Sequence, residues 1–179
     1  MSGVYIEYKK TIKNFSVDSK YSSNDNYNLI KELKFNDGNK IRLNTDDIVI
    51  STMPITELAK ILGIKNKLWN RSLKIVNILI QGNIELPERY DWLYFDDKKI
   101  LFHRITLQNS FSEFGIPKDH SILSCEIAYS ENDKISKLSR NQVLKKCIKD
   151  IKSLKQFKDI AIVDTHLIDA KSVYPGIYS

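Results

Sequence analysis

The chain has 179 residues, a formal net charge of +6, and 42% hydrophobic and 28% charged residues. This apolar content can supply one core, so we expect residues 1–179 to form a single domain. No run of about 18 apolar residues occurs and no basic segment precedes an apolar stretch at the start, so we expect a cytoplasmic protein without a membrane span.

The first third of the chain predicts a strand, a loop and a hairpin. Residues 4–12 alternate apolar and polar side chains, which is the period of a half-buried strand. Residues 16–28 are polar and rich in turn formers, which predicts a mobile loop. Residues 29–35 and 40–43 flank an Asp-Gly pair, and this dipeptide supplies the positive backbone angles that a tight hairpin requires.

The segment that follows predicts a strand, a sharp turn and a short helix. Residues 48–50 are Ile-Val-Ile, an unbroken apolar run that is typical of a strand covered on both faces. Pro54 suits the first turn of a helix, and apolar residues then repeat at helical spacing as far as Leu62. Gly63 follows where a helix favours a left-handed residue.

The remainder predicts five more strands and one long helix. The strands are expected at residues 72–80, at 92–95 and 100–105 as a hairpin, at 122–129 and at 160–167. Ser139 and Gln142 form a capping box, so the helix should begin there and run to about residue 157. The predicted fold class is therefore α+β, with a mixed or largely antiparallel sheet and helices packed on one side.

Lysine side chains are spread along the chain and interleaved with acidic residues. The nearest cluster comprises Lys145, Lys146, Lys149, Lys152 and Lys155, which is the spacing of one solvated helix face. This distribution favours a solvent-exposed helix surface over a nucleic-acid-binding site. No nucleic-acid partner is therefore expected.

Several kinds of active site lack their signature in this sequence. The six glycines are isolated, so neither a dinucleotide fingerprint nor a phosphate-binding loop is present. No histidine has a Cys, Asp or Glu at the usual ligand spacing, and no metal site is expected. Cys125 and Cys147 stand in apolar patterns, which predicts two buried thiols.

One hairpin gathers polar and aromatic residues that suit ligand binding: Trp92, Tyr94, His103, Arg104 and Asn109. An Arg side chain can clamp a phosphate or carboxylate through two hydrogen bonds, while Tyr and Trp stack on flat rings. The alternative is that these are ordinary core or edge residues of a sheet. The catalytic residues stay unknown at this stage.

A resemblance to a known family rests on several segments in order: residues 47–58 (Asp-Ile-Val-Ile-Ser-Thr-Met-Pro-Ile-Thr-Glu-Leu), 71–73, 92–95, 102–105, 121–127 and 170–175. Together they resemble the flavin amine oxidase superfamily, in particular its branch similar to protoporphyrinogen oxidase and UDP-galactopyranose mutase. The likeness covers about residues 28–179 and is most specific at the Val-Ile-Ser-Thr-Met-Pro block. It implies that this block runs as a strand into a tight bend, and a block outside any sheet would count against it.

The resemblance also implies that segments absent from this chain would bind the cofactor. Such proteins hold FAD with glycine-rich segments, which this chain lacks, so it is expected to be the substrate-side middle of a larger flavoprotein and inactive alone. The missing FAD-binding domain would be its partner, and FAD would be bound only in the full-length protein. By resemblance, Ser51, Thr52, Met53 and Pro54 would lie beside FAD. Tyr94 and Arg104, and Asn109 just beyond them, would face the substrate.

The function implied is part of an FAD-dependent oxidoreductase or mutase that acts on nucleotide sugars or lipopolysaccharide precursors. Two other hypotheses remain open. One is a stand-alone basic binding module without catalysis, whose affinity for polyanions would fall steeply with salt. The other is an interaction domain with an exposed apolar side that marks a missing partner.

Overall fold

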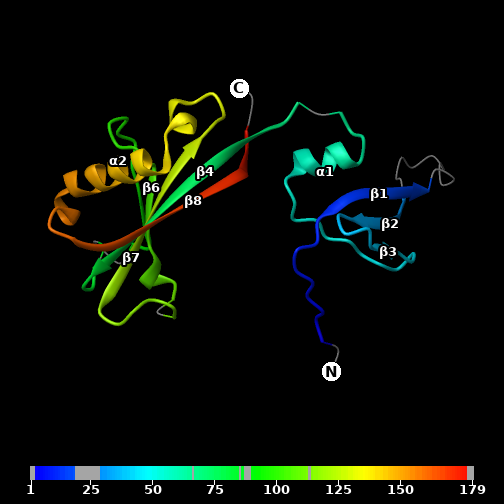
Figure 1. Cartoon of the computed structure of the whole chain (residues 1–179), viewed down its shortest axis with the longest axis horizontal. Helices are drawn as coiled ribbons and strands as arrows, with labels where there is room; N and C mark the ends of the chain where they lie inside the picture. The colour runs from blue at the N-terminus through cyan, green and yellow to red at the C-terminus, as the bar shows by residue number, and fades with distance from the viewer. Residues whose placement is uncertain are drawn as a thin grey trace. The chain divides into compact units, whose positions relative to one another are not determined.

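The computed structural model describes residues 3–18, 29–65, 67–84, 86, 90–112 and 114–176. The chain divides into two compact units, Met1–Lys67 and Leu68–Ser179 (Figure 1). Nothing in the composition had indicated this division. No helix among the described residues has the length and apolar character needed to cross a bilayer.

The first unit contains a three-stranded antiparallel sheet in the order β1-β2-β3. Its strands are β1 (Ile12–Asp18), β2 (Leu29–Phe35) and β3 (Lys40–Arg42). The predicted hairpin is confirmed as β2 and β3, and Gly38 in its turn has a φ of 86°. Only a residue without a side chain adopts such an angle at little cost.

Two predictions near the start of this unit are wrong. The strand expected at residues 4–12 is absent apart from Ile12, because the ladder begins only where Ile12 pairs with Phe35. Lys9 has a φ of 61°, which interrupts the extended backbone before that point. The loop expected at 16–28 begins too early, since Ser16 belongs to β1, and its residues 19–28 lie outside the described residues.

The segment around residues 48–50 is partly corrected. Helix α1 (Ile55–Ile61) is confirmed, with Pro54 as its N-cap and Gly63 at a φ of 71° just beyond it. The strand predicted before it is wrong, because no described strand pairs with residues 48–50. Ile48 and Ile50 are 87% and 85% exposed. An apolar run indicates burial, but a strand also needs a partner to hydrogen-bond, and the described strands of this unit supply none to residues 48–50.

The second unit is a five-stranded antiparallel sheet in the order β5-β6-β7-β4-β8 with one long helix. The elements are β4 (Trp69–Gln81), β5 (Trp92–Tyr94), β6 (Arg104–Leu107), β7 (His120–Tyr129), α2 (Arg140–Ser153) and β8 (Ala161–Gly176). Short 3-10 turns are η2 (Gln108–Ser110), η3 (Lys134–Lys137) and η4 (Lys155–Phe157). The predicted fold class is confirmed. The second strand of the predicted hairpin starts later than expected, and β8 extends further.

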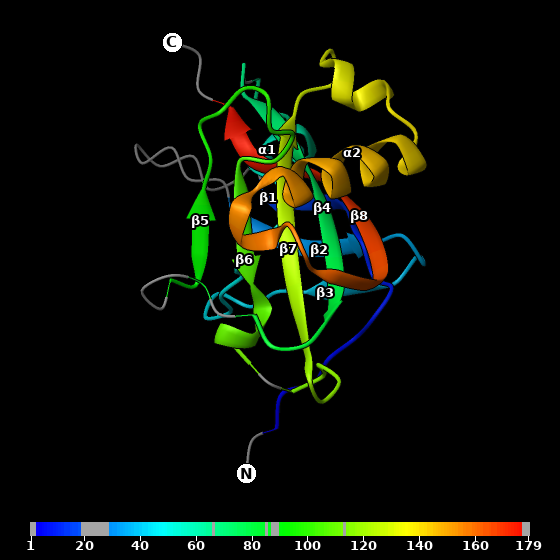
Figure 2. The same ribbon diagram turned by 90° about the vertical axis from the view of Figure 1, so that its left-hand side faces the viewer.

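The core of this unit lies between α2 and one face of the sheet (Figure 2). Val143, Cys147 and Ile151 recur every four residues along α2 and are fully buried. They belong to one cluster with Val76 and Cys125. The two thiols are buried and free, as predicted, and the pKa of Cys125 is raised by its hydrogen bond to Cys147 and by burial.

The capping box at the start of α2 allows a first prediction. The Ser139 side chain accepts a hydrogen bond from the backbone N–H of Gln142, whose side chain accepts one from the backbone N–H of Ser139. Ser139→Ala should lower the free energy of unfolding by about 1 kcal/mol, measured by urea denaturation. Ser139→Gly should cost only a few tenths, about 0.3 kcal/mol. Equal losses in both variants would contradict a capping role.

A charged cluster on β4 and β8 predicts how stability depends on pH. Burial of the Asp169 carboxyl group opposes its ionisation, but hydrogen bonds from Lys74 at 2.7 Å and from Tyr129, and the charges of Lys74 and Lys171, outweigh burial and lower its pKa. A lowered pKa stabilises the fold at pH values above about 3.9, the ordinary value, and this stabilisation is lost as the pH falls through the lower folded value.

The test compares acid unfolding of the wild type with that of Asp169→Asn. The stability of the wild type should fall more steeply than that of Asp169→Asn as the pH is lowered, because the variant has no carboxyl group to protonate at this position. Urea midpoints measured between about pH 6 and pH 2 give the two curves. Asp159→Asn changes an exposed carboxyl group after η4, and its stability should fall with pH as steeply as that of the wild type. Parallel curves for the wild type and Asp169→Asn would refute the assignment.

Candidate functional site

The face of the five-stranded sheet opposite α2, here called the open face, carries two cross-strand rows of side chains. The strand registers place Tyr94, Arg104, Glu126, Ile75 and Ile168 in one row. No described helix of this unit packs against these residues as α2 does against the other face. Because alternate residues of a strand share a face, the apolar core and this polar row come from the same strands.

The neighbouring row on the open face consists of Trp92, Thr106, Ser124, Asn77 and His166. Polar residues therefore occupy the centre of the sheet on this face, where Thr106 and Ser124 are buried. Buried polar groups require hydrogen-bond partners. The open face is organised by such bonds.

The strongest interaction on the open face joins Arg104 to Glu126. Nε and Nη2 of Arg104 donate to Oε1 of Glu126 at 2.9 and 2.6 Å, and Nη2 also donates to Oε2 at 2.7 Å. Nη1 donates to the Tyr94 hydroxyl at 3.2 Å. The hydrogen bonds with Glu126 raise the pKa of Arg104, so the guanidinium stays charged and fixed in orientation.

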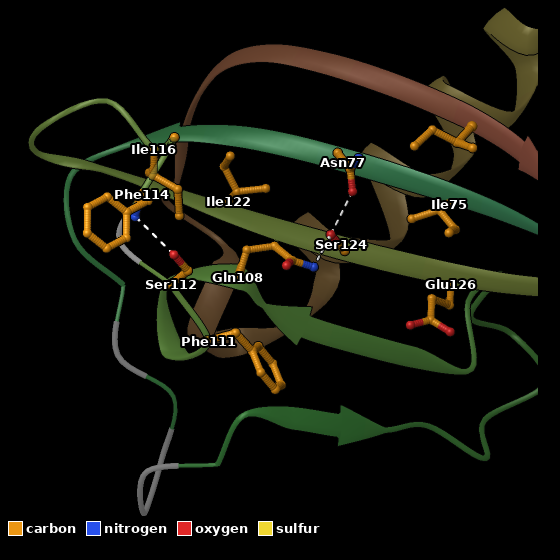
Figure 3. Close-up of a pocket in the computed structure, with 12 residues that line it drawn as sticks. Ile75, Asn77, Gln108, Phe111, Ser112, Phe114, Ile116, Ile122, Ser124 and Glu126 are labelled. Atoms are coloured by element: carbon orange, nitrogen blue, oxygen red, sulfur yellow. Dashed lines mark hydrogen bonds between the residues drawn. The ribbon is translucent and has the colours of Figure 1, made fainter. Parts of the chain in front are cut away.

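A second chain of hydrogen bonds crosses three elements beside this pair (Figure 3). Gln108 Nε2 donates to Ser124 Oγ at 2.8 Å, and Ser124 Oγ donates to Asn77 Oδ1 at 2.6 Å. Both bonds border a cavity of about 470 Å³ whose other walls include Ile75, Phe111 and Glu126, among further apolar side chains. The cavity combines a largely apolar lining with a few fixed polar groups, as small-molecule sites do.

The structure brings together some of the predicted site residues and separates others. Tyr94 and Arg104 are in contact, with the guanidinium 5.7 Å from the ring centre. Trp92 stacks on Phe111, which lines the cavity. Asn109 lies apart from this pair, in a pocket of about 590 Å³. Its amide group bonds to the backbone of β7, donating to the carbonyl of His120 and accepting from the N–H of Ile122.

The residues predicted to lie beside FAD belong to the first unit. Ser51 and Thr52 are exposed and Met53 and Pro54 are half-buried, in an irregular segment that ends at the start of α1. They are described within their own unit only. Among the described residues of the chain, no group of three or more His, Cys, Asp or Glu side chains is arranged to hold a metal ion.

Comparison with known proteins shows which fold this is. No protein-family profile matches the sequence, and no curated protein matches it. The structure is similar to that of reduced UDP-galactopyranose mutase, with a TM-score of 0.62 and 21% identity, over 81% of this chain and 32% of that one. It is equally similar, at a TM-score of 0.62 and 14% identity, to a protein assigned as a protoporphyrinogen oxidase from Exiguobacterium sp. 255-15, over 94% of this chain and 35% of that one.

The chain therefore has the fold of part of these proteins and spans about a third of their length. The fold likeness to UDP-galactopyranose mutase and to a protoporphyrinogen oxidase that the sequence resemblance implied is confirmed. The block at residues 48–50 lies outside any described sheet, contrary to the prediction from the resemblance.

Sequence reasoning missed three residues of the open face: Asn77, Ser124 and Glu126. Each lies within a predicted strand and alternates with buried apolar neighbours. Polar residues at alternate positions of otherwise apolar strands indicate a face that does not join the main core, and this signal was available. Which of them meet each other depends on strand register, which the sequence does not specify.

Proposed function

We propose that this chain is the substrate-side part of an FAD-dependent oxidoreductase or mutase, and that its open face forms one wall of the substrate cavity. The observation that carries the proposal is the Arg104–Glu126 pair beside the 470 Å³ cavity, on a sheet with the fold of part of UDP-galactopyranose mutase. The substrate class we propose is a nucleotide sugar or a related lipopolysaccharide precursor.

Arg104 is the principal substrate-binding residue in this proposal. Glu126 occupies Nε and Nη2, so Nη1, which also bonds to Tyr94, is the group left to reach an oxygen atom of the substrate. The guanidinium side chain is 27% exposed whereas that of Glu126 is 9% exposed, so the ion pair presents its cationic partner to the ligand. Tyr94 adds a ring surface and a hydroxyl group, and Asn109 shapes the neighbouring pocket.

FAD would be held in the complete protein, with Ser51, Thr52, Met53 and Pro54 beside it. The flavin would supply the redox or nucleophilic chemistry, and this chain would bind and orient the substrate. Ile48 and Ile50, which are exposed in this structure, would become a covered strand against the missing FAD-binding domain of the same protein. The exposure of these two apolar residues supports this, because exposed apolar side chains are typical of an interface.

The test is to express the coding sequence together with its flanking segments and measure flavin absorbance in the purified protein. We expect a yellow protein that loses its flavin when Ile48 and Ile50 are both changed to Asp. Val4→Asp is the matched control, because Val4 is 89% exposed but lies outside the region of resemblance. A colourless full-length protein would overturn the proposal.

Substrate binding is tested separately in the same flavin-loaded protein. Arg104→Met with Glu126→Leu should weaken binding of UDP-galactose by about 10- to 100-fold while flavin content is unchanged. Unchanged affinity in this double variant would remove Arg104 from the substrate site. The double replacement is preferred because it leaves no unpaired carboxylate in the sheet.

A further inference from the structure

A pocket of about 400 Å³ lies at one end of the five-stranded sheet, outside the cavity described above. It is lined by Arg71, Leu101, His103, Ala128 and Tyr174. The register of β4 and β8 places Arg71 directly across from Tyr174. His103, which directly precedes β6 in the chain, also lines the pocket. Three polar side chains from separate segments therefore share one pocket, here called the Arg71 pocket.

Two buried nitrogen atoms in the Arg71 pocket lack a hydrogen-bond partner among the described residues. They are Nε of Arg71 and Nδ1 of His103. The guanidinium makes one long hydrogen bond, from Nη2 to the carbonyl oxygen of Ala128 at 3.4 Å. Buried polar groups are nearly always paired, so two such atoms in one pocket point to a ligand that completes them.

The charge of the Arg71 pocket is uncompensated within the described part of the chain. No described carboxylate lies within 4.0 Å of the Arg71 guanidinium. Glu126 does not serve as its counter-ion, because both carboxylate oxygens of Glu126 accept hydrogen bonds from Arg104. Burial lowers the pKa of His103, and the positive charges of Arg104 and Arg71 lower it further against the opposing effect of Glu126. A half-buried cation without a counter-ion favours an anionic ligand.

We propose that the Arg71 pocket binds an oxyanion of the phosphate class, either free phosphate or a phosphate ester. The Arg71 guanidinium can donate two parallel hydrogen bonds to phosphate oxygens. The imidazole of His103 and the hydroxyl of Tyr174 can donate to further oxygens, which a tetrahedral anion presents in several directions and a planar carboxylate does not. This proposal does not depend on the flavin, because the pocket lies wholly within Leu68–Ser179.

The direct test is an NMR titration of the 179-residue chain with inorganic phosphate at constant ionic strength. The imidazole Cε1–H signal of His103 should shift and saturate, while an equal concentration of acetate should not produce a saturating shift. Glycerol 3-phosphate distinguishes the two sources: tighter binding than phosphate identifies an ester site, and equal or weaker binding identifies a free-phosphate site. A His103 signal that does not saturate with either phosphate ligand would overturn the proposal.

Charge-matched variants separate a built site from the general basic charge of the chain. Arg71→Gln should weaken phosphate binding by about tenfold or more, because both parallel hydrogen bonds are lost. Arg42→Gln removes the same charge from a side chain that is 92% exposed, and it should leave the affinity within about twofold. Equal weakening in both variants would show non-specific attraction and refute the site.

A milder variant keeps the test valid if Arg71→Gln does not fold. Tyr174→Phe removes one hydroxyl group from the Arg71 pocket and retains the ring, so it should fold and bind phosphate more weakly than the wild type. Unchanged affinity in Tyr174→Phe together with an unshifted His103 signal would exclude a ligand in this pocket. Either result leaves the proposed flavin-dependent function unaffected, since that rests on Arg104 and the open face.

Discussion

Arg104→Met should lower the free energy of unfolding by about 2–3 kcal/mol, which is a large part of the stability of a small domain. The reason is the carboxylate that remains. Glu126 is 9% exposed and takes all its charged hydrogen bonds from Arg104, so removing the guanidinium leaves a negative charge without a partner inside the sheet. Urea denaturation at pH 7 measures the loss.

The double variant Arg104→Met with Glu126→Leu should recover most of that stability, because both charges are replaced by apolar groups of similar volume. The coupling between the two sites is then read from a double-mutant cycle. Arg42→Met is the surface control, since Arg42 only approaches Glu32 at 3.9 Å, and it should change stability by less than about 0.5 kcal/mol. Additive losses at the two sites would show that the pair is not coupled.

Phe102→Ala should be the most destabilising single change in the second unit, at about 3–5 kcal/mol. Phe102 is fully buried in the main core and meets Phe95 edge to face, with ring centres 5.3 Å apart. Truncation removes apolar surface that folding buries away from water, and it leaves a cavity that the packed sheet and α2 cannot close. A loss of this size should greatly lower the urea midpoint or abolish the cooperative transition of this unit.

Phe114→Ala provides the matched control for this cavity. Phe114 is 96% exposed, so the same truncation should alter the free energy of unfolding by less than about 0.5 kcal/mol. The two variants remove the same atoms and differ only in burial. Similar destabilisation in both would mean that Phe102 is not part of a tightly packed core.

The elements predicted best from sequence are those whose own residues contain the whole signal. Helix α2 has both its capping box and its apolar repeat within residues 139–154, and its start is predicted correctly. Strands β4 and β7 carry an apolar residue at most alternate positions, and they pair with each other along ten positions. Their partners lie in the same unit, so pattern and structure agree.

Residues 4–12 and 48–50 show where the same signals fail. Alternation and apolar runs indicate which residues can form a strand, but the ladder requires a second strand that the sequence pattern does not identify. Ile48 and Ile50 have the composition of a buried strand and are exposed in this structure. The prediction failed because hydrogen bonding between strands is a property of the whole fold.

The open face was predictable in part. Aromatic and guanidinium groups suit ligand binding, which predicts Tyr94 and Arg104 as site residues, and the hairpin register brings them together. Glu126 lies 22 residues from Arg104 in the chain and was not chosen, because only the register of β6 against β7 places the two side chains opposite each other. Asn109 was chosen by its nearness in sequence, whereas its amide group stabilises the end of β7.

The burial of Cys125 and Cys147 between β7 and α2 makes these thiols internal reporters of the docking of that helix. A water-soluble alkylating reagent can reach neither sulfur atom until α2 moves away from the sheet. The rate of alkylation at increasing urea therefore measures how often this helix detaches, separately from events in Met1–Lys67, which contains no cysteine. The native sequence thus contains a probe for the second unit alone, without any added label.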